Sequence, residues 1–310
     1  MEQVQPLDPG VRRDDGLVVA MLFFVMALGN SPMSFKDHFS GIADAYAAAR
    51  PEYPDELFDL IAAQVPCDAR VWEPGCGSGQ ATRGLAARFA QVHATDPSAQ
   101  QVAQHWAFDS SFPRRRESKD VDPSKAKSMD SRLRGNDGQG DITLAVESGE
   151  RTTLPDASVQ LVAVAQALHW FDRAAFFAEC ARVLAPGGVL AAWGYGDFVA
   201  PEGMVEEVAD FRALIEPYWP PERALVDAHY AGFDWPFPSL PAPPLWLEAE
   251  WSLPHFLRYL SSMSATARCR ADLGEDPVAR HAPALARAWG EADDLRTLRW
   301  PLFLHLRRKP

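Results

Sequence analysis

The chain has 310 residues, enough to bury a full core in one large domain or in a nucleotide-binding domain with a smaller cap. Its 30 Lys and Arg residues against 42 Asp and Glu residues give a formal net charge of −12, which argues against a nucleic-acid-binding surface. The four cysteines form no C-x-x-C pair, as is typical of reduced thiols in a cytosolic protein. We therefore expect a cytoplasmic protein with neither nucleic-acid nor membrane partners, for which a monomer is a plausible state.

Residues 1–32 form an N-terminal extension that we interpret as not native. It contains an apolar run, residues 17–28, which is too short to span a bilayer. The run resembles a weak signal peptide, but Asp14 and Asp15 reduce the positive charge before it and no A-x-A cleavage site follows. We therefore predict that Met33 is the natural start.

Residues 71–79 read V-W-E-P-G-C-G-S-G, an acidic strand end followed by glycine at every second position. A short strand that ends at Glu73 and leads into such a turn predicts a backbone that can adopt positive φ and approach a ligand closely. A dinucleotide site would read G-x-G-x-x-G instead, with a helix N-terminus free to hold a pyrophosphate. The three glycines of the turn are Gly75, Gly77 and Gly79.

A second acidic residue, Asp96, follows the next predicted strand, Gln91–Thr95. It lies 21 residues after Gly75, and an acid about 20 positions past the first glycine is placed to accept hydrogen bonds from ribose hydroxyls. Asp96 could instead only cap the helix that begins at Pro97. Together with the glycine turn, its position predicts that it binds the ribose of a cofactor.

Residues 108–141 form an insert that we predict to be a disordered loop. The segment is rich in Arg, Lys and Gly and has almost no apolar periodicity, so it cannot bury enough surface to order itself. Its residues 111–118 and 130–137 can be encoded by complementary strands of one DNA sequence, which is typical of a translated palindromic repeat. The alternative is a basic lid over a substrate.

The remaining elements alternate between strand and helix. We predict strands at 142–146, Val159–Ala165 and 189–193, a helix at 173–184, a helix at 201–217, and antiparallel strands at Leu245–Trp251 and 297–306. This order predicts the α/β class, a doubly wound Rossmann-like sheet of seven mostly parallel strands with an antiparallel last strand and a small C-terminal cap. Residues 33–200 would form the core, and 201–310 the cap and the last two strands.

Many aromatic residues lie between residues 218 and 244. They could wall an apolar acceptor pocket, or they could form the core of the cap. The residues are Trp219, Tyr230, Phe233, Trp235 and Phe237.

A series of short motifs recurs along residues 34–195 in a fixed order. They are Tyr46, Arg50-Pro51, Tyr53-Pro54, the glycine turn, Asp96-Pro97-Ser98, Leu154-Pro155, residues 166–171 and residues 182–188. Together they resemble the class I S-adenosylmethionine-dependent methyltransferases, in particular the methyltransferase type 11 set of small-molecule enzymes that includes trans-aconitate methyltransferase. The resemblance implies S-adenosyl-L-methionine as the cofactor and a small molecule as the acceptor.

The resemblance also implies roles in cofactor binding. The glycine turn would hold the methionine moiety, Glu73 would support the cofactor ammonium or the loop amides, and Asp96 would bind the ribose. Glu150 lies in the segment where family members line the adenine and would orient that loop. Gln166 lies at the tip of the fourth strand, beside the cofactor.

The catalytic candidates on the acceptor side are Tyr46, Arg50 and His169. Arg50 could pair with a carboxylate through its guanidinium, or could pin a helix start near Pro51. His169 follows the fourth strand, where the methyl group would point, and is either catalytic or a packed histidine. No spacing of His, Asp or Glu indicates a metal site.

Methyl transfer is an in-line displacement that depends on holding the nucleophile against the methyl group and excluding water. We expect transfer to a carboxylate or another oxygen, which needs no base when the acceptor is a carboxylate. A carbon methyltransferase that acts on a quinone-type ring would need a base near His169 and a broader apolar mouth. A cofactor-binding protein without turnover is the third possibility.

Overall fold

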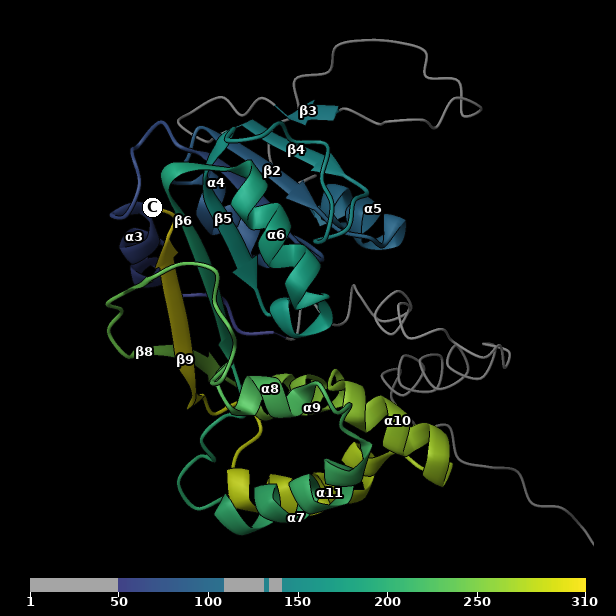
Figure 1. Cartoon of the computed structure of the whole chain (residues 1–310). Coiled ribbons are helices and arrows are strands. Elements are labelled where there is room, and N and C mark those ends of the chain that lie inside the picture. Colours follow the sequence, from purple (N-terminus) through teal and green to yellow (C-terminus); the bar gives the residue numbers. More distant parts are fainter. Residues whose placement is uncertain (1–49, 109–130, 134–140) are drawn as a thin grey trace, which may run out of the picture. The chain divides into compact units, whose positions relative to one another are not determined.

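The computed structural model describes residues 50–108, 131–133 and 141–310 (Figure 1). The predicted extension 1–32, Met33, Tyr46 and most of the predicted insert lie outside the described residues. All described residues belong to one compact unit.

Five parallel strands form the centre of the sheet, in the order β4-β2-β1-β5-β6. The central strands β1, β5 and β6 are buried on both faces along most of their length, as is typical of parallel strands covered by helices, whereas in β2 and β4 buried residues alternate with more accessible ones. The strand order reverses at β1, so the carboxyl ends of β1, β2 and β5 meet at the position where doubly wound folds bind ligands. The strands are β1 (Arg70–Pro74), β2 (Gln91–Thr95), β4 (Asp141–Ala145), β5 (Val159–Ala165) and β6 (Leu184–Tyr195).

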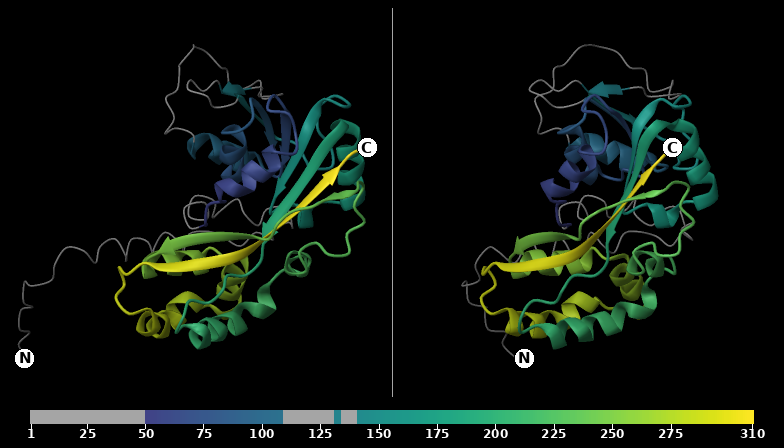
Figure 2. Two further views of the ribbon diagram at one scale, coloured as in Figure 1. Left: turned by 90° about the vertical axis from the view of Figure 1, so that its left-hand side faces the viewer. Right: turned by 60° about the vertical axis from the view of Figure 1, so that its left-hand side comes forward.

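The long antiparallel strand β9 (Arg296–Arg308) joins this sheet to the C-terminal region. One half of β9 pairs with β6, and the other half pairs with β8 (Leu245–Trp251). Figure 2 shows β9 running from the sheet into the region of the last helices. The predicted antiparallel strands at Leu245–Trp251 and 297–306 are therefore confirmed.

The described sheet has nine strands, two more than the predicted seven. The additional strands are very short: β7 (Ser239–Leu240) pairs with β9, and β3 (Ser131–Leu133) pairs with β4. The strand β3 lies inside the segment predicted to be a disordered loop. These three residues form an antiparallel edge beside Ile142–Leu144, and most of the remaining segment lies outside the described residues.

Helices cover both faces of the parallel strands. The α3, α4 and α5 helices pack on one face, whereas α6 packs on the other. Successive strand residues accordingly enter different cores: Val71 lies with α3 and α4, and Trp72 lies with α6. The bounds are α3 (Asp55–Ala62), α4 (Gln80–Ala86), α5 (Ala99–Phe108) and α6 (Arg173–Val183).

The C-terminal region is more helical than the sequence analysis predicted. The predicted helix at 201–217 is α7 (Val205–Ile215), but the short helix α8 and the three helices that follow β8 were not predicted. They form the cap with α7, in the lower part of Figure 1. The unpredicted elements are α8 (Arg223–Asp227), α9 (Leu253–Ser261), α10 (Ser264–Leu273) and α11 (Pro277–Trp289).

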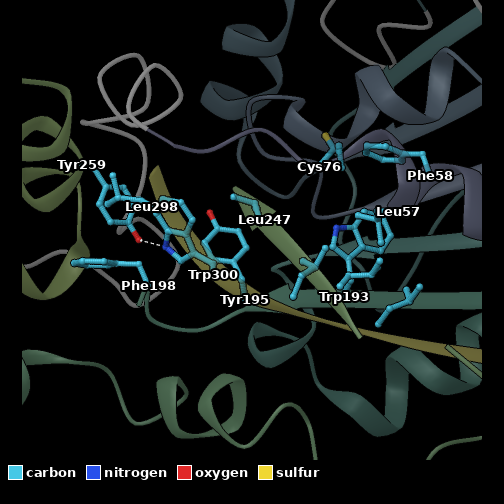
Figure 3. Packing of buried hydrophobic residues seen from close by; sticks show 14 of the residues in the cluster. Leu57, Phe58, Cys76, Trp193, Tyr195, Phe198, Leu247, Tyr259, Leu298 and Trp300 are labelled. Carbon is cyan, nitrogen blue, oxygen red and sulfur yellow. Dashed lines mark hydrogen bonds between the residues drawn. The ribbon is translucent and has the colours of Figure 1, made fainter. Parts of the chain in front are cut away.

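A continuous aromatic core joins the cap to the sheet. The Trp300 ring of β9 packs against Tyr195, Phe198 and Tyr259, and its Nε1 donates a hydrogen bond of 2.9 Å to the Tyr259 hydroxyl (Figure 3). Further along the same core, Trp193 packs edge-on against Phe58 of α3. This packing fixes α9 near the carboxyl end of β6.

Among residues 50–108, 131–133 and 141–310, no helix combines the length and the apolar character that crossing a membrane requires.

Replacing Gly84 with alanine is expected to lower the melting temperature. Alanine normally stabilises a helix interior by about 1 kcal/mol relative to glycine. At Gly84, however, a Cβ atom would lie 2.2 Å from two ring carbons of Phe58, which is 3% exposed and packed between Trp193 and Arg88. Overpacking of this kind costs about 1–3 kcal/mol, so the net effect should be destabilising.

Thermal unfolding of the Gly84→Ala variant tests this expectation. The double variant Gly84→Ala/Phe58→Leu is the control, because the smaller leucine side chain should relieve the contact and recover part of the loss. A melting temperature of Gly84→Ala equal to or above that of the wild type would contradict the packing described for α3 and α4.

Candidate active site

The glycine turn between β1 and α4 has the predicted left-handed conformation. Gly75, Gly77 and Gly79 have φ values of +71°, +54° and +87°. A Cβ atom at Gly75 would lie 2.7 Å from that of Ala167, and one at Gly79 would lie 2.4 Å from the His105 ring. A Cβ at Gly77 would meet nothing within 4 Å. Two of the glycines are therefore needed for packing within the protein, and Gly77 is the one that faces open space.

Asp96 holds this turn in place from the end of β2. Its Oδ2 accepts a hydrogen bond of 3.0 Å from the Gly77 N–H, and its Oδ1 accepts one of 2.8 Å from the Ser98 N–H. The side chain is largely buried, and burial raises the pKa of the carboxyl, whereas the Ser98 and Gly77 amides oppose this shift. Each oxygen keeps acceptor capacity for a second donor.

Glu73 lies beside the turn as a buried carboxylate. It is 1% exposed, and neither of its oxygens has a hydrogen-bond partner among the described residues. Burial raises the pKa of Glu73 to about 8, although the Thr82 hydroxyl is near enough to lower it in part. A buried carboxylate without a partner is costly, and a positively charged amino group bound there would remove the cost.

The loop after β4 is fastened to the start of α6. The Oε1 atom of Glu150 accepts a hydrogen bond of 3.0 Å from the Asp172 N–H. A Cβ atom at Gly149 would lie 2.8 Å from the Phe171 ring, the same ring that lies against Gly75. The Glu150 side chain therefore contacts the protein backbone at the start of α6.

Gln166 follows β5 in a strained conformation. Its φ is +51°, which is uncommon for a residue other than glycine. The Nε2 group donates a hydrogen bond of 2.7 Å to the Tyr195 carbonyl, and the Gln166 N–H donates one of 3.0 Å to the Trp193 carbonyl. These bonds tie the ends of β5 and β6 together at the edge of the candidate site.

A cleft of about 100 Å³ lies where the ends of β5 and β6 meet the cap. Arg50 and His169, two of the predicted catalytic residues, line this cleft together with Gln166. The third, Tyr46, lies outside the described residues. The other lining residues include Trp170, Tyr195, Asp197, Trp219, Arg223, Val226, Tyr259 and Met263.

Two guanidinium groups in the cleft wall lie over aromatic rings. The Cζ atom of Arg50 lies 5.3 Å from the ring centroid of Tyr259, and that of Arg223 lies 4.5 Å from the ring of Trp219. Arg223 also forms an ion pair of 2.7 Å with Asp227. The planar guanidinium keeps further donors beyond such a pair, so this wall can bind an anion.

Arg50 was predicted from the sequence as a site residue, whereas Arg223, Tyr259 and Met263 were not. No local signal distinguishes these residues, because they lie on separate cap elements that only the tertiary structure brings together.

Of the aromatic residues between 218 and 244, only Trp219 lines the cleft. The other four belong to the core that contains α6 or pack against it, so they form neither the pocket wall nor the core of the cap that the sequence suggested. These are Tyr230, Phe233, Trp235 and Phe237.

Tyr53 has a structural position. Its ring makes edge contacts with Phe58, Trp193 and Tyr195 at centroid distances of 5.9–6.3 Å. In the described part of the chain, no group of three or more His, Cys, Asp or Glu side chains is arranged to hold a metal ion.

The fold and these residues define a class of protein, an α/β enzyme that binds a nucleoside cofactor at the switch point of a doubly wound sheet. A family model for a methyltransferase domain matches residues 108–192. A protein of Dictyostelium discoideum assigned as a methyltransferase is 27% identical, over 90% of this chain and 97% of the relative.

Two further comparisons agree. An uncharacterised methyltransferase of Mycobacterium tuberculosis is 31% identical over 61% of this chain and 69% of the relative. The solved structure of a protein of Anaeromyxobacter dehalogenans, assigned as a type II methyltransferase, is 36% identical with a TM-score of 0.68, and the match covers 84% of this chain and 97% of that chain. The chain belongs to the class I S-adenosylmethionine-dependent methyltransferases, and S-adenosylmethionine is its cofactor.

Proposed function

We propose that this methyltransferase methylates a carboxylate oxygen of a small molecule with an apolar body. The observation that carries the proposal is the pair of guanidinium groups, Arg50 and Arg223, in a cleft otherwise lined largely by aromatic and apolar side chains. Such a wall suits an anionic group on an apolar body, because guanidinium binds carboxylate through paired hydrogen bonds. The finer resemblance to trans-aconitate methyltransferase agrees with an acid as the acceptor.

The cofactor residues fit S-adenosylmethionine. In this proposal the partnerless carboxylate of Glu73 faces the ammonium group, the open side of Gly77 faces the methionine moiety, and Asp96 accepts from the ribose hydroxyls. Glu150 orients the loop that lines the adenine, and Gln166 sets the position of the end of β5. When bound, S-adenosylmethionine supplies an electrophilic methyl group carried on a sulfonium.

The rival reaction, methylation of a carbon on a quinone-type ring, requires a base near His169. Burial and the charge of Arg223 lower the pKa of His169 to about 4, so the imidazole is neutral at pH 7 but is a weak base. A carboxylate acceptor is already ionised at pH 7 and transfers no proton to the protein when it is methylated. Because His169 is a weak base, the cleft favours methylation of a carboxylate over methylation of a ring carbon.

An assay with radiolabelled S-adenosylmethionine and a panel of acceptors tests the proposal. The panel holds dicarboxylic, tricarboxylic and phenolic acids, a quinone-type ring and the methyl esters of the acids. Methyl transfer to a free acid but not to its ester supports the proposal. Transfer to a quinone-type ring alone, or cofactor binding without transfer to any member, contradicts it.

Replacing Arg223 with leucine should lower kcat/KM for the acid by at least about tenfold, chiefly through KM, because one charge-assisted hydrogen bond is lost. Affinity for the cofactor should not change. Arg299→Leu is a matched control: Arg299 also pairs with a carboxylate, Glu248, at 2.7 Å, and also lies 4.5 Å from a tryptophan ring, Trp246, but it does not line the cleft. Equal losses in the two variants would contradict a role for Arg223 in acceptor binding.

A further inference from the structure

Tyr230 lies in the core directly behind His169. Its hydroxyl is 3.0 Å from Nδ1 of His169, and the residue is 1% exposed. The Tyr230 ring stacks on Phe233 and meets Phe303 edge-on, with both centroid distances at 5.0 Å. The hydroxyl is therefore held in one place, against Nδ1 of His169, and Nε2 is the ring nitrogen left for the cleft that His169 lines.

The backbone that carries Tyr230 is strained. His229 and Tyr230 have φ values of +50° and +55°, two successive left-handed residues that are not glycine. Each such residue costs of the order of 1 kcal/mol and persists only where the surroundings enforce it. Here the N–H groups of His229 and Tyr230 donate to carbonyls of α8, and His305 bonds to the His229 carbonyl. The turn is thus built to direct the Tyr230 side chain inward.

The protons of the pair can be assigned. Burial raises the pKa of Tyr230, so its hydroxyl keeps its proton, and His169 is neutral at pH 7. Among the described residues, Nδ1 of His169 is the acceptor within hydrogen-bond distance of that hydroxyl. If Nδ1 carried the imidazole proton instead, the tyrosine proton would be buried without an acceptor, which costs about 1–3 kcal/mol. The single imidazole proton is therefore on Nε2.

We propose that Tyr230 is a positioning residue that holds His169 in the Nε2–H tautomer, so that His169 presents a hydrogen-bond donor, and no base, to the acceptor. This inference rests on the proposed function, because it takes the cleft to be the acceptor site. It deepens that function: a donor beside Arg50 and Arg223 selects an acceptor oxygen that is already ionised.

Two other polar groups in the cleft wall, the Asp197 carboxylate and the Tyr259 hydroxyl, already have partners. Asp197 is paired with Arg212 at 2.7 Å and also accepts from the Phe198 N–H. The Tyr259 hydroxyl accepts from Trp300, and burial raises its pKa. A phenol must lose a proton before its oxygen can be methylated, whereas a carboxylate need not. Since Asp197 and Tyr259 already have partners, the described lining residues favour a carboxylate acceptor over a phenol.

Nitrogen-15 NMR of protein labelled at histidine tests the tautomer without any acceptor. For the wild type we expect a protonated Nε2 and an unprotonated Nδ1 of His169 between pH 6 and 8, both with and without S-adenosylhomocysteine. In Tyr230→Phe we expect a mixture of tautomers. A wild-type His169 that is protonated on Nδ1, or that becomes doubly protonated near pH 6.5, would overturn the proposal.

Kinetics with the best acid of the panel test whether Tyr230 acts through His169. Tyr230→Phe should lower kcat/KM by about fivefold or more, in line with the loss of one oriented hydrogen bond. In a His169→Gln background, where the amide donates without help from Tyr230, the same change should cost less than about twofold. Equal losses in the two backgrounds would overturn the positioning role.

Phe233→Leu is the packing control, because it disturbs the ring of Tyr230 and keeps the hydroxyl. It should lower the melting temperature and leave the tautomer unchanged. A tautomer shift as large as that of Tyr230→Phe would reduce the role of Tyr230 to packing and overturn the proposal. If the wild type methylates no acid, the proposed function fails, and the NMR result still decides the tautomer.

Discussion

Replacing Asp96 with alanine is expected to weaken the binding of S-adenosylmethionine by at least about 100-fold, the largest effect that we expect of any single side chain. Two contributions add. The variant loses the acceptor for the ribose hydroxyls, and charge-assisted hydrogen bonds contribute about 1.5–3 kcal/mol each. It also releases the Gly77 N–H, which Asp96 holds at 3.0 Å, so the glycine turn loses one of its hydrogen bonds at the end of β2, while the bond from the Cys76 N–H to the Thr95 carbonyl remains.

Isothermal titration calorimetry with S-adenosylhomocysteine measures this effect, and circular dichroism confirms that the variant is folded. Asp141→Ala is the control, because Asp141 begins the neighbouring strand β4 at the opposite edge of the sheet. We expect wild-type affinity in this control. Wild-type affinity in folded Asp96→Ala would refute the assignment of Asp96 to the ribose.

Replacing Glu73 with glutamine should stabilise the cofactor-free protein at pH 8 and weaken cofactor binding. The pKa of Glu73 is raised to about 8 in the folded state from 4.5 in the unfolded chain, chiefly by burial. Below pH 4.5 the carboxyl is protonated in both states. As the pH rises from 4.5 to 8, the unfolded chain loses the proton and the folded protein retains it, so stability falls.

Each unit of such a shift corresponds to about 1.4 kcal/mol, so the wild type should lose several kcal/mol of stability across this range. Urea unfolding at pH 5 and pH 8 should show the loss in the wild type and a much smaller one in Glu73→Gln. Glu147→Gln should have the opposite effect on the stability of the folded protein at pH 8. The pKa of Glu147 is lowered to about 2 by hydrogen bonds from His93, Thr152 and Thr153, so removing its charge should destabilise the protein at pH 8.

The protons released on cofactor binding test independently whether Glu73 faces the ammonium group. An ammonium group beside this carboxyl favours its ionised form, so binding at pH 6.5 should release close to one proton. Calorimetry in buffers of different ionisation enthalpy counts that proton, and Glu73→Gln should release about none. If the wild type and the variant release the same number, Glu73 does not face the ammonium group.

The sequence alone was sufficient for the features that depend on short stretches of chain. A strand buried on both faces appears as an apolar run, as in β5, and a strand with one buried face appears as an alternation, as in β8. These two strands and β2 were predicted with the bounds that the structure has. The glycine turn and Asp96 were predicted because a tight turn and an acidic strand end each require particular residue types at fixed spacing. These local requirements established the fold class, the family and the cofactor.

Other features depended on contacts that spacing does not encode. Nothing in the sequence distinguishes Gly75 and Gly79, which pack against Ala167 and His105, from Gly77, which faces open space. The segment predicted as a loop also contains three residues that pair with the edge of β4, a contact between strands that the sequence pattern does not indicate.

The acceptor site was the least predictable part. Its walls come from residues as distant in sequence as Arg50, His169 and Tyr259, and from the cap helices that the sequence analysis missed. Those helices are stabilised by a core shared with β9, so their formation depends on the long strand that carries Trp300 across from the sheet. The sequence by itself determined the fold class, the chemistry and the cofactor, because these follow from local backbone geometry. Only the tertiary structure decided which side chains face the acceptor, because that depends on long-range packing.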